Sequence, residues 1–153
     1  MLRRTFLLGA AALSACGPSL PAVPPERVVD RIYDPYRGRG EGGRMRLQNA
    51  APWTDDLKNM IAAADRRAVQ TGKTWIEVDP FLNARDVEVG QISATADAPP
   101  ADGKATVTAR FTLSGQPGQV TYDLVVVGKE WRVANIRGEN YNLEAIAARG
   151  VVN

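Results

Sequence analysis

The sequence contains no histidine and a single cysteine, Cys16, among its 153 residues. The chain therefore cannot form an internal disulfide bond, and zinc sites built from cysteine and histidine are excluded. Catalytic triads and dyads that use histidine as the base are excluded as well. A carboxylate site for calcium needs no histidine, but the spacing of an EF-hand loop is absent. We accordingly expect neither a metal ion nor a cofactor.

An excess of charge of one sign is also missing. The chain has 19 basic and 17 acidic side chains, and 17 of each remain once Arg3 and Arg4 are removed with the leader described below. A domain with balanced charge has no overall field that attracts nucleic acid, so we expect no nucleic-acid partner. The apolar fraction of 44% and the length fit one folded domain.

The first sixteen residues have the organisation of an export signal. Two arginines precede an apolar stretch, Phe6–Leu13, which is too short to span a bilayer core of about 30 Å. The run Leu13-Ser14-Ala15-Cys16 resembles the lipobox that prolipoprotein signal peptidase recognises. The resemblance implies that residues 1–15 are a cleaved lipoprotein signal peptide and that Cys16 becomes the lipidated first residue. The alternative is that Cys16 is a small residue beside an ordinary secretory cleavage site.

Lipidation of Cys16 would tie a periplasmic domain to a membrane without a transmembrane helix. Gly17 follows where some Gram-negative lipoproteins carry an inner-membrane Asp, which favours the outer membrane. The run Arg3–Leu7 also resembles a twin-arginine motif, so both general secretory and twin-arginine export stay open. Residues 16–25 form a proline-rich tether, which we expect to be a stiff spacer that does not pack.

Helical spacing of apolar residues marks two segments in the first half of residues 26–153, the expected domain. The first helix begins at Pro25 and should end or kink at Pro35. A loop rich in glycine and arginine follows over residues 37–52, either solvated or in contact with anionic head groups. Thr54 is the expected N-cap of the second helix, which Gly72 should stop.

Apolar residues alternate with polar ones after residue 74, which predicts strands. We expect a β-bulge near Ala134–Asn135, because Ile136 is out of phase with Trp131 and Val133. The expected strands are 75–78, 87–96, 105–113, 120–126 and 131–136, with turns at 98–103, 116–118 and 128–129 and a last helix at 143–149 between Asn142 and Gly150. This order predicts an α+β fold, with N-terminal helices packed on a curved antiparallel sheet of about four strands.

Three segments carry a resemblance to a known family: Ile32–Tyr36, Val78–Asp86 and Glu130–Ile136. They resemble a family of uncharacterised bacterial proteins similar to the ketosteroid-isomerase and nuclear-transport-factor superfamily, over residues 25–137. The resemblance implies a cystatin-like cone with a pocket at its open end, and the candidate pocket residues are Tyr33, Tyr36, Asp79, Phe81 and Tyr122. The superfamily includes enzymes, transport factors and inactive domains, so the fold alone assigns no function.

An isomerase-like enzyme would need a carboxylate base and an acidic hydrogen-bond donor in a dry pocket. The candidate bases are Asp79, Asp86 and Asp123, and the candidate donors are Tyr33, Tyr36 and Tyr122. In the alternative interpretation, which we favour, Asp79 caps its own turn and the tyrosines pack in the core. Arg110 and Asp123 on neighbouring strands are expected to form an ion pair.

The tryptophans are the remaining candidates for contact with a ligand. We expect Trp131 to belong to the core, and Trp53 either to stack on a sugar or lipid or to pack beside the Thr54 cap. The sequence therefore predicts a lipid-anchored, non-catalytic accessory domain of the envelope that binds a small apolar ligand or an envelope protein. A pocket enzyme of isomerase or hydratase type and a purely structural lipoprotein are the alternatives.

Overall fold

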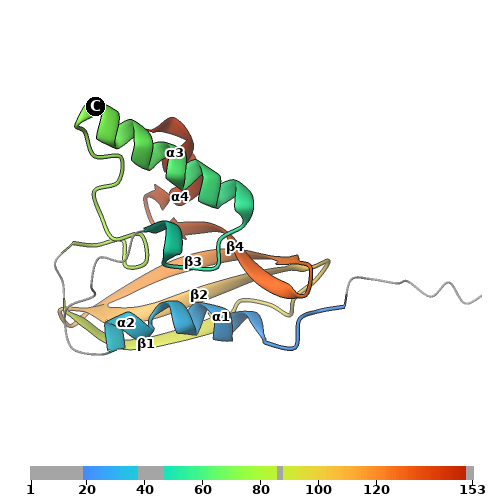
Figure 1. Cartoon of the computed structure of the whole chain (residues 1–153). Helices are drawn as coiled ribbons and strands as arrows, with labels where there is room; N and C mark the ends of the chain where they lie inside the picture. The colour runs from blue at the N-terminus through green and yellow to red at the C-terminus, as the bar shows by residue number, and fades with distance from the viewer. Residues whose placement is uncertain (1–18, 38–46, 86–87, 151–153) are drawn as a thin grey trace, which may run out of the picture.

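The computed structural model describes residues 19–37, 47–85 and 88–150 (Figure 1). Helices come first and a meander of strands follows, which confirms the predicted α+β class. The helical elements are α1 (Pro25–Ile32), α2 (Asp34–Arg37), the 3₁₀ turn η1 (Leu47–Asn49), α3 (Asp55–Thr71) and α4 (Leu143–Arg149). The strands are β1 (Val89–Ala96), β2 (Lys104–Leu113), β3 (Gln116–Val127), β4 (Glu130–Gly138) and β5 (Tyr141–Asn142). They form one antiparallel sheet in the order β1-β2-β3-β4-β5.

The helix ends follow the capping residues of the sequence. The hydroxyl of Thr54 accepts a hydrogen bond from the Leu57 N–H at the start of α3, and Gly72 ends that helix with φ of 65°. The side chain of Asn142 caps α4 by accepting from the Ala145 N–H at 2.9 Å. These predicted caps are confirmed, and each satisfies a backbone N–H that the first helical turn leaves without a partner.

One predicted turn is wrong. The β2–β3 turn is Ser114-Gly115, with φ of 48° and 83°, and not the segment 116–118. Pro117 lies inside β3 opposite Thr112. In this hairpin that pair is a non-hydrogen-bonded one, so the missing proline N–H points away from β2. There β3 has no second neighbour, since its pairing with β4 begins at Thr121, and the proline costs no ladder bond.

The predicted bulge in β4 is confirmed. Asp123 pairs with Asn135 and Leu124 pairs with Val133, which leaves Ala134 as the extra residue. The bulge turns Ile136 into the core, where it is fully buried. The outer edge of β4 is covered by residues 52–54, whose backbone exchanges hydrogen bonds with Val133.

The predicted strand at 75–78 is wrong, and the short strand β5 was not predicted. Trp75 is buried because it packs beside α3, where its Nε1 donates to Asp65 at 2.7 Å. Its burial therefore comes from a helix and not from alternation in a sheet. The predicted ion pair of Arg110 with Asp123 is also wrong, because the register places Arg110 opposite Gln119. Asp123 instead accepts two hydrogen bonds from Arg137, at 2.7 and 2.8 Å.

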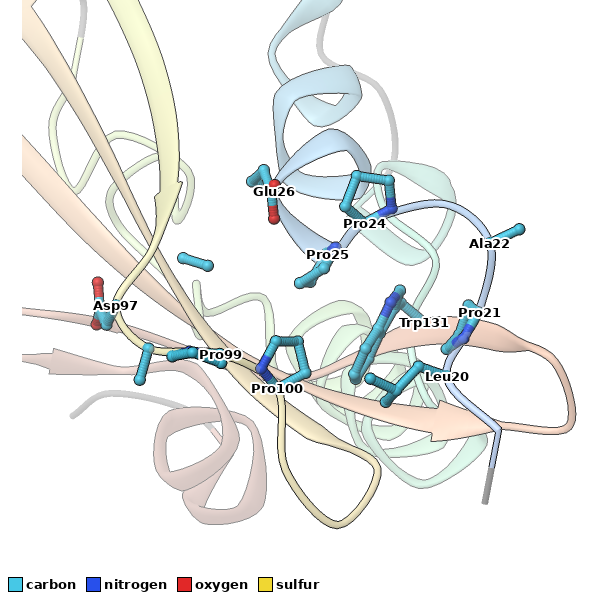
Figure 2. A pocket seen from close by; sticks show the side chains of 12 residues that line it. Leu20, Pro21, Ala22, Pro24, Pro25, Glu26, Asp97, Pro99, Pro100 and Trp131 are labelled. Carbon is cyan, nitrogen blue, oxygen red and sulfur yellow. The ribbon is translucent and has the colours of Figure 1, made fainter. Parts of the chain in front are cut away.

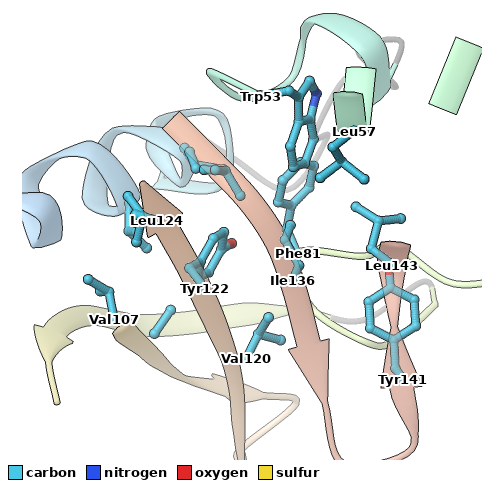
Figure 3. Packing of buried hydrophobic residues seen from close by; sticks show 14 of the residues in the cluster. Trp53, Leu57, Phe81, Val107, Val120, Tyr122, Leu124, Ile136, Tyr141 and Leu143 are labelled. Atoms are coloured by element: carbon cyan, nitrogen blue, oxygen red, sulfur yellow. The ribbon is translucent and has the colours of Figure 1, made fainter. Parts of the chain in front are cut away.

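A single core joins the sheet to the helices at both of its edges. α1 packs against β1 and β2, whereas α3 and α4 pack against each other and against β4. Figure 3 shows side chains from β2, β3 and β4 in this core, together with Trp53 and Phe81. In the part of the chain that the structure describes, no helix is long and apolar enough to cross a membrane.

Candidate functional site

The break between α1 and α2 places Tyr33 in the core and the half-buried Tyr36 against it. α1 ends at Ile32, and Tyr33 follows with φ near −90° and ψ near 0° before α2 begins. Tyr33 is fully buried, with its ring centroid 5.8 Å from that of Tyr36 and 6.2 Å from that of Tyr122 on β3. The Pro35 of the sequence thus ends α1, as predicted, and the resulting corner directs both hydroxyls towards segment 79–84.

Segment 79–84 is a tight turn that enters the core. The Asp79 N–H donates to the Ala84 carbonyl, and the Asp79 carboxylate accepts from the Phe81 N–H at 2.8 Å. This is the predicted self-capped turn of Asp79. It drives Phe81 inwards, where the ring stacks on Trp53 at a centroid distance of 5.9 Å. Trp53 is only 4% exposed, so the packed alternative for this residue is confirmed.

Four of the five predicted pocket residues join through side-chain hydroxyl and carboxylate groups, and the fifth joins through its backbone. The Tyr122 hydroxyl donates to the Tyr33 hydroxyl at 2.8 Å, and the Tyr33 hydroxyl donates to the Phe81 carbonyl at 2.8 Å. The Tyr36 hydroxyl donates to the Asp79 carboxylate at 2.6 Å. We call these five residues the tyrosine–aspartate network. The predicted residues therefore do converge, including one of the Asp–Tyr pairs that an isomerase would need.

The protonation of the network follows from its burial. Loss of solvation raises the pKa of Asp79 above the ordinary value, while hydrogen bonds from Tyr36 and from the backbone N–H groups partly oppose this rise. Burial also raises the pKa of Tyr33, Tyr36 and Tyr122, so all three stay neutral donors at physiological pH. A carboxylate of raised pKa facing a neutral tyrosine can exchange a proton with a bound substrate, if a substrate reaches it.

Tyr33, Phe81 and Tyr122 are buried, whereas Tyr36 and Asp79 are half-buried. Two surface pockets lie elsewhere, and none of the five network residues lines either of them. The Phe81 carbonyl already accepts the hydrogen bond that the Tyr33 hydroxyl could otherwise donate to a ligand. Of the other candidate bases, Asp123 lies outside the network in its pair with Arg137, and Asp86 falls outside the described residues.

One residue of this region was not predicted. Tyr141 on β5 is 7% exposed, and its hydroxyl finds no hydrogen-bond partner among the residues described. Burial and the nearby Asp79 charge raise its pKa. The only sequence signal was an aromatic residue just before the Asn142 cap, and the pairing that buries it, Gly138 with Tyr141, follows a turn that the sequence analysis left out.

A second site was missed because the tether was expected not to pack. Residues 20–22, 24–26 and 96–100 line an open pocket of about 450 Å³, and Trp131 lines it as well (Figure 2). Trp131 is buried, as predicted, but its Nε1 has no hydrogen-bond partner within the described part of the chain. The doublets Pro24-Pro25 and Pro99-Pro100 were the signal for this site, since both contribute to its wall.

Comparisons with known proteins add little to this geometry. No protein-family model matches the chain, and no curated protein matches it. A phospholipid-binding protein from Ralstonia solanacearum, solved in complex with a phospholipid, shares 13% identity over 79% of the chain, with a TM-score of 0.35. The chain spans 59% of the length of that protein. Similarity at this level does not assign a function.

Proposed function

We propose that the protein is a lipid-anchored accessory protein of the bacterial envelope, held through Cys16 on the periplasmic side of a membrane, with the outer membrane favoured. Its domain binds a ligand or partner and does not catalyse a reaction. The basic and apolar leader, the lipobox-like run and the proline-rich tether support the anchor. Charge balance in the chain without its leader supports a role away from nucleic acid.

The observation that carries the binding role is the mutual hydrogen bonding of the polar groups in the tyrosine–aspartate network. Its hydroxyls and its carboxylate already bind one another and the backbone of Phe81, so the groups suited to chemistry hold the fold together. A pocket with a mainly apolar lining lies at the tether instead. Binding proteins of this kind need an apolar hollow with a few polar groups, and they need no base.

The anchor is tested by labelling growing cells with a radioactive fatty acid. The wild-type chain should carry label and fractionate with membranes, whereas Cys16→Ser should lose the label and accumulate as an uncleaved precursor. A Ser14→Ala variant is the matched control, because it keeps the thiol and a small residue at that position. Persistent labelling of Cys16→Ser would refute the anchor.

An isomerase-type enzyme is the second candidate, because burial raises the pKa of Asp79 and the Tyr36 hydroxyl lies 2.6 Å from its carboxylate. This function requires segment 79–84 to open and admit a substrate. A β,γ-unsaturated ketone, followed by the absorbance of its conjugated isomer, tests it. Turnover that Asp79→Asn abolishes would favour the enzyme over the binding domain, and equal background rates would exclude this reaction.

A further inference from the structure

The two edges of the sheet differ in how they are covered. At one edge, β5 pairs with the end of β4, and residues 52–54 exchange backbone hydrogen bonds with Val133 of β4. At the other edge, away from α3 and α4 in Figure 1, β1 pairs with β2 on one side and no further strand of the described chain adjoins it. An uncovered edge strand offers free backbone groups to another strand, and proteins commonly blunt such an edge.

The hydrogen-bond phase of β1 shows which of its backbone groups are free. The Asp97 N–H donates to the Thr106 carbonyl, and hydrogen-bonded pairs alternate along an antiparallel ladder, so the odd-numbered residues from 93 to 97 face β2. The N–H and C=O groups of Ile92, Ala94 and Ala96 therefore point outwards. No described residue forms a backbone hydrogen bond with them. We call residues 92–96 the open edge.

The open edge has none of the usual features that prevent strand pairing. β1 contains no charged residue and no proline, whereas β2, β3 and β4 each contain at least one charged side chain. The irregularity of β1, between Val89 and Ile92, leaves residues 92–96 in regular register with β2. A regular, uncharged edge is suited to accept a further strand.

The apolar side chains of the open edge are only partly covered. Ile92, Ala94 and Ala96 lie on the core face of the sheet, each opposite a buried residue of β2. They pack against the core but are themselves only half-buried. A strand beside β1 would extend the core face and remove these side chains from water, which adds hydrophobic stabilisation to the backbone hydrogen bonds.

The backbone of the open edge can pair with a second copy of itself. In an antiparallel pair centred on Ala94, the outward groups of Ile92 meet those of Ala96 in the other copy, and Ala94 meets Ala94. Each of these three pairs exchanges two hydrogen bonds, about six in all. The match is exact in phase, because every outward group then faces another outward group.

The side chains are complementary in the same register. On the core face the large Ile92 lies beside the small Ala96 of the other copy. On the opposite face Ser93 lies beside Thr95, a favourable hydroxyl pair. Asp97 falls opposite an uncharged residue, Gln91, so no like charges meet across the pair.

We propose that the open edge pairs with the open edge of a second copy of this chain, antiparallel across a twofold axis at Ala94, so that one sheet runs through both copies. Each copy has one open edge, so the association stops at a dimer. A contact of five residues per chain is small, and we expect reversible association with a Kd of roughly 10–100 μM. The inference does not depend on the proposed function, since it uses the domain alone.

Sedimentation equilibrium of the full chain with Cys16→Ser tests the dimer, because this variant carries no lipid and no thiol. Concentrations from about tenfold below to about tenfold above the expected Kd should show a monomer–dimer equilibrium.

A matched pair of proline variants tests the location. Ala94→Pro removes an N–H that points away from β2, so the β1–β2 ladder keeps its bonds, while the dimer loses its two central bonds. It should weaken association by about tenfold or more. Gln119→Pro is the control: its N–H also points away from β2, at an exposed position of β3 before the pairing with β4 begins, and association should not change. Thermal melts of both variants show whether the fold is retained.

A spin label on Ser93→Cys, in the same Cys16→Ser chain, tests the register. The two copies of position 93 should lie about 8 Å apart between Cα atoms, two residues along the strand and one strand spacing across. The electron paramagnetic resonance spectrum should broaden with concentration and sharpen when unlabelled chain is added. A label on Val69→Cys, which is 84% exposed on α3, should not broaden.

Three results would overturn the inference: a monomer at every concentration, a dimer that Ala94→Pro leaves intact, and a dimer without broadening at position 93. A photoreactive amino acid at position 93 extends the test to the chain in its own cells. Crosslinking to a different protein, with the isolated chain monomeric, would identify another occupant of the open edge and refute self-association. Lipid labelling of Cys16 is measured separately, so its failure would leave the dimer standing.

Discussion

The tyrosine–aspartate network leads to a quantitative prediction about Tyr33. Its hydroxyl accepts a hydrogen bond from the Tyr122 hydroxyl and donates one to the Phe81 carbonyl. Tyr122→Phe removes one buried hydrogen bond, that from the Tyr122 hydroxyl to the Tyr33 hydroxyl. Tyr33→Phe removes this bond and the bond to the Phe81 carbonyl, and it leaves both former partners unpaired in the core. Each substitution deletes one hydroxyl oxygen, so a difference in their costs reflects the number of hydrogen bonds that each hydroxyl makes.

The expected magnitudes follow from typical hydrogen-bond energetics. One net hydrogen bond contributes about 1 kcal/mol, so Tyr122→Phe should lower the free energy of unfolding by about that amount. Tyr33→Phe should cost roughly 3 kcal/mol, since a buried group without a partner adds its own desolvation penalty. The double variant leaves only the Phe81 carbonyl unpaired, and it should cost no more than Tyr33→Phe alone and about 1 kcal/mol less than the sum of the two single variants.

Urea denaturation followed by tryptophan fluorescence measures these values, because the chain has three tryptophans that are all buried. Equal denaturant slopes for the four proteins would show that the comparison concerns the folded state. The two bonds at the Tyr33 hydroxyl would be refuted if the stability losses of the single variants simply added in the double variant. They would also be refuted if Tyr33→Phe lowered the free energy of unfolding no more than Tyr122→Phe does.

Three further predictions concern single positions. Burial raises the pKa of Asp79, so the folded state favours its protonated carboxyl. The stability of the wild-type protein relative to Asp79→Asn should therefore be greatest below the ordinary Asp pKa of about 4 and should fall as the pH rises through the raised pKa. Thermal melts of both proteins between acidic and neutral pH measure this difference. Gly118→Ala should destabilise by roughly 1–3 kcal/mol, since a Cβ there would lie 2.6 Å from the Phe111 ring, and an unchanged unfolding midpoint would contradict the tight hairpin. Asn135→Ala should cost about 2 kcal/mol in the same assay, because its side-chain oxygen accepts from the N–H groups of Ile136 and Glu144, and a loss below about 0.5 kcal/mol would show that other groups satisfy them.

Local features of the fold were predictable because their causes are local. Thr54 and Asn142 cap helices through bonds to residues three positions away, and the phase of Ile136 relative to Val133 requires the bulge. Pairing register is not local. The wrong Arg110–Asp123 pair and the wrong turn at 116–118 both came from a β2–β3 register that depends on where the hairpin turns.

The candidate site shows the same division. The sequence identified the residue types that meet in the network, but not their convergence, since Tyr33 and Tyr122 are 89 positions apart. The sequence also did not show whether these groups bind one another or a ligand, because only the turn at Asp79 brings the Phe81 carbonyl to the Tyr33 hydroxyl. The pocket at the tether was missed for a related reason. Residues 16–25 were predicted to be a spacer that does not pack and residues 98–103 a turn, whereas prolines from both segments line this pocket.

The most direct test of the proposed anchor is the intact mass of the native protein extracted from the membranes of its own cells. The account predicts a chain that begins at Cys16, with the added mass of a diacylglyceryl group on its sulfur. A chain that still begins at Met1 with an unmodified thiol would contradict it.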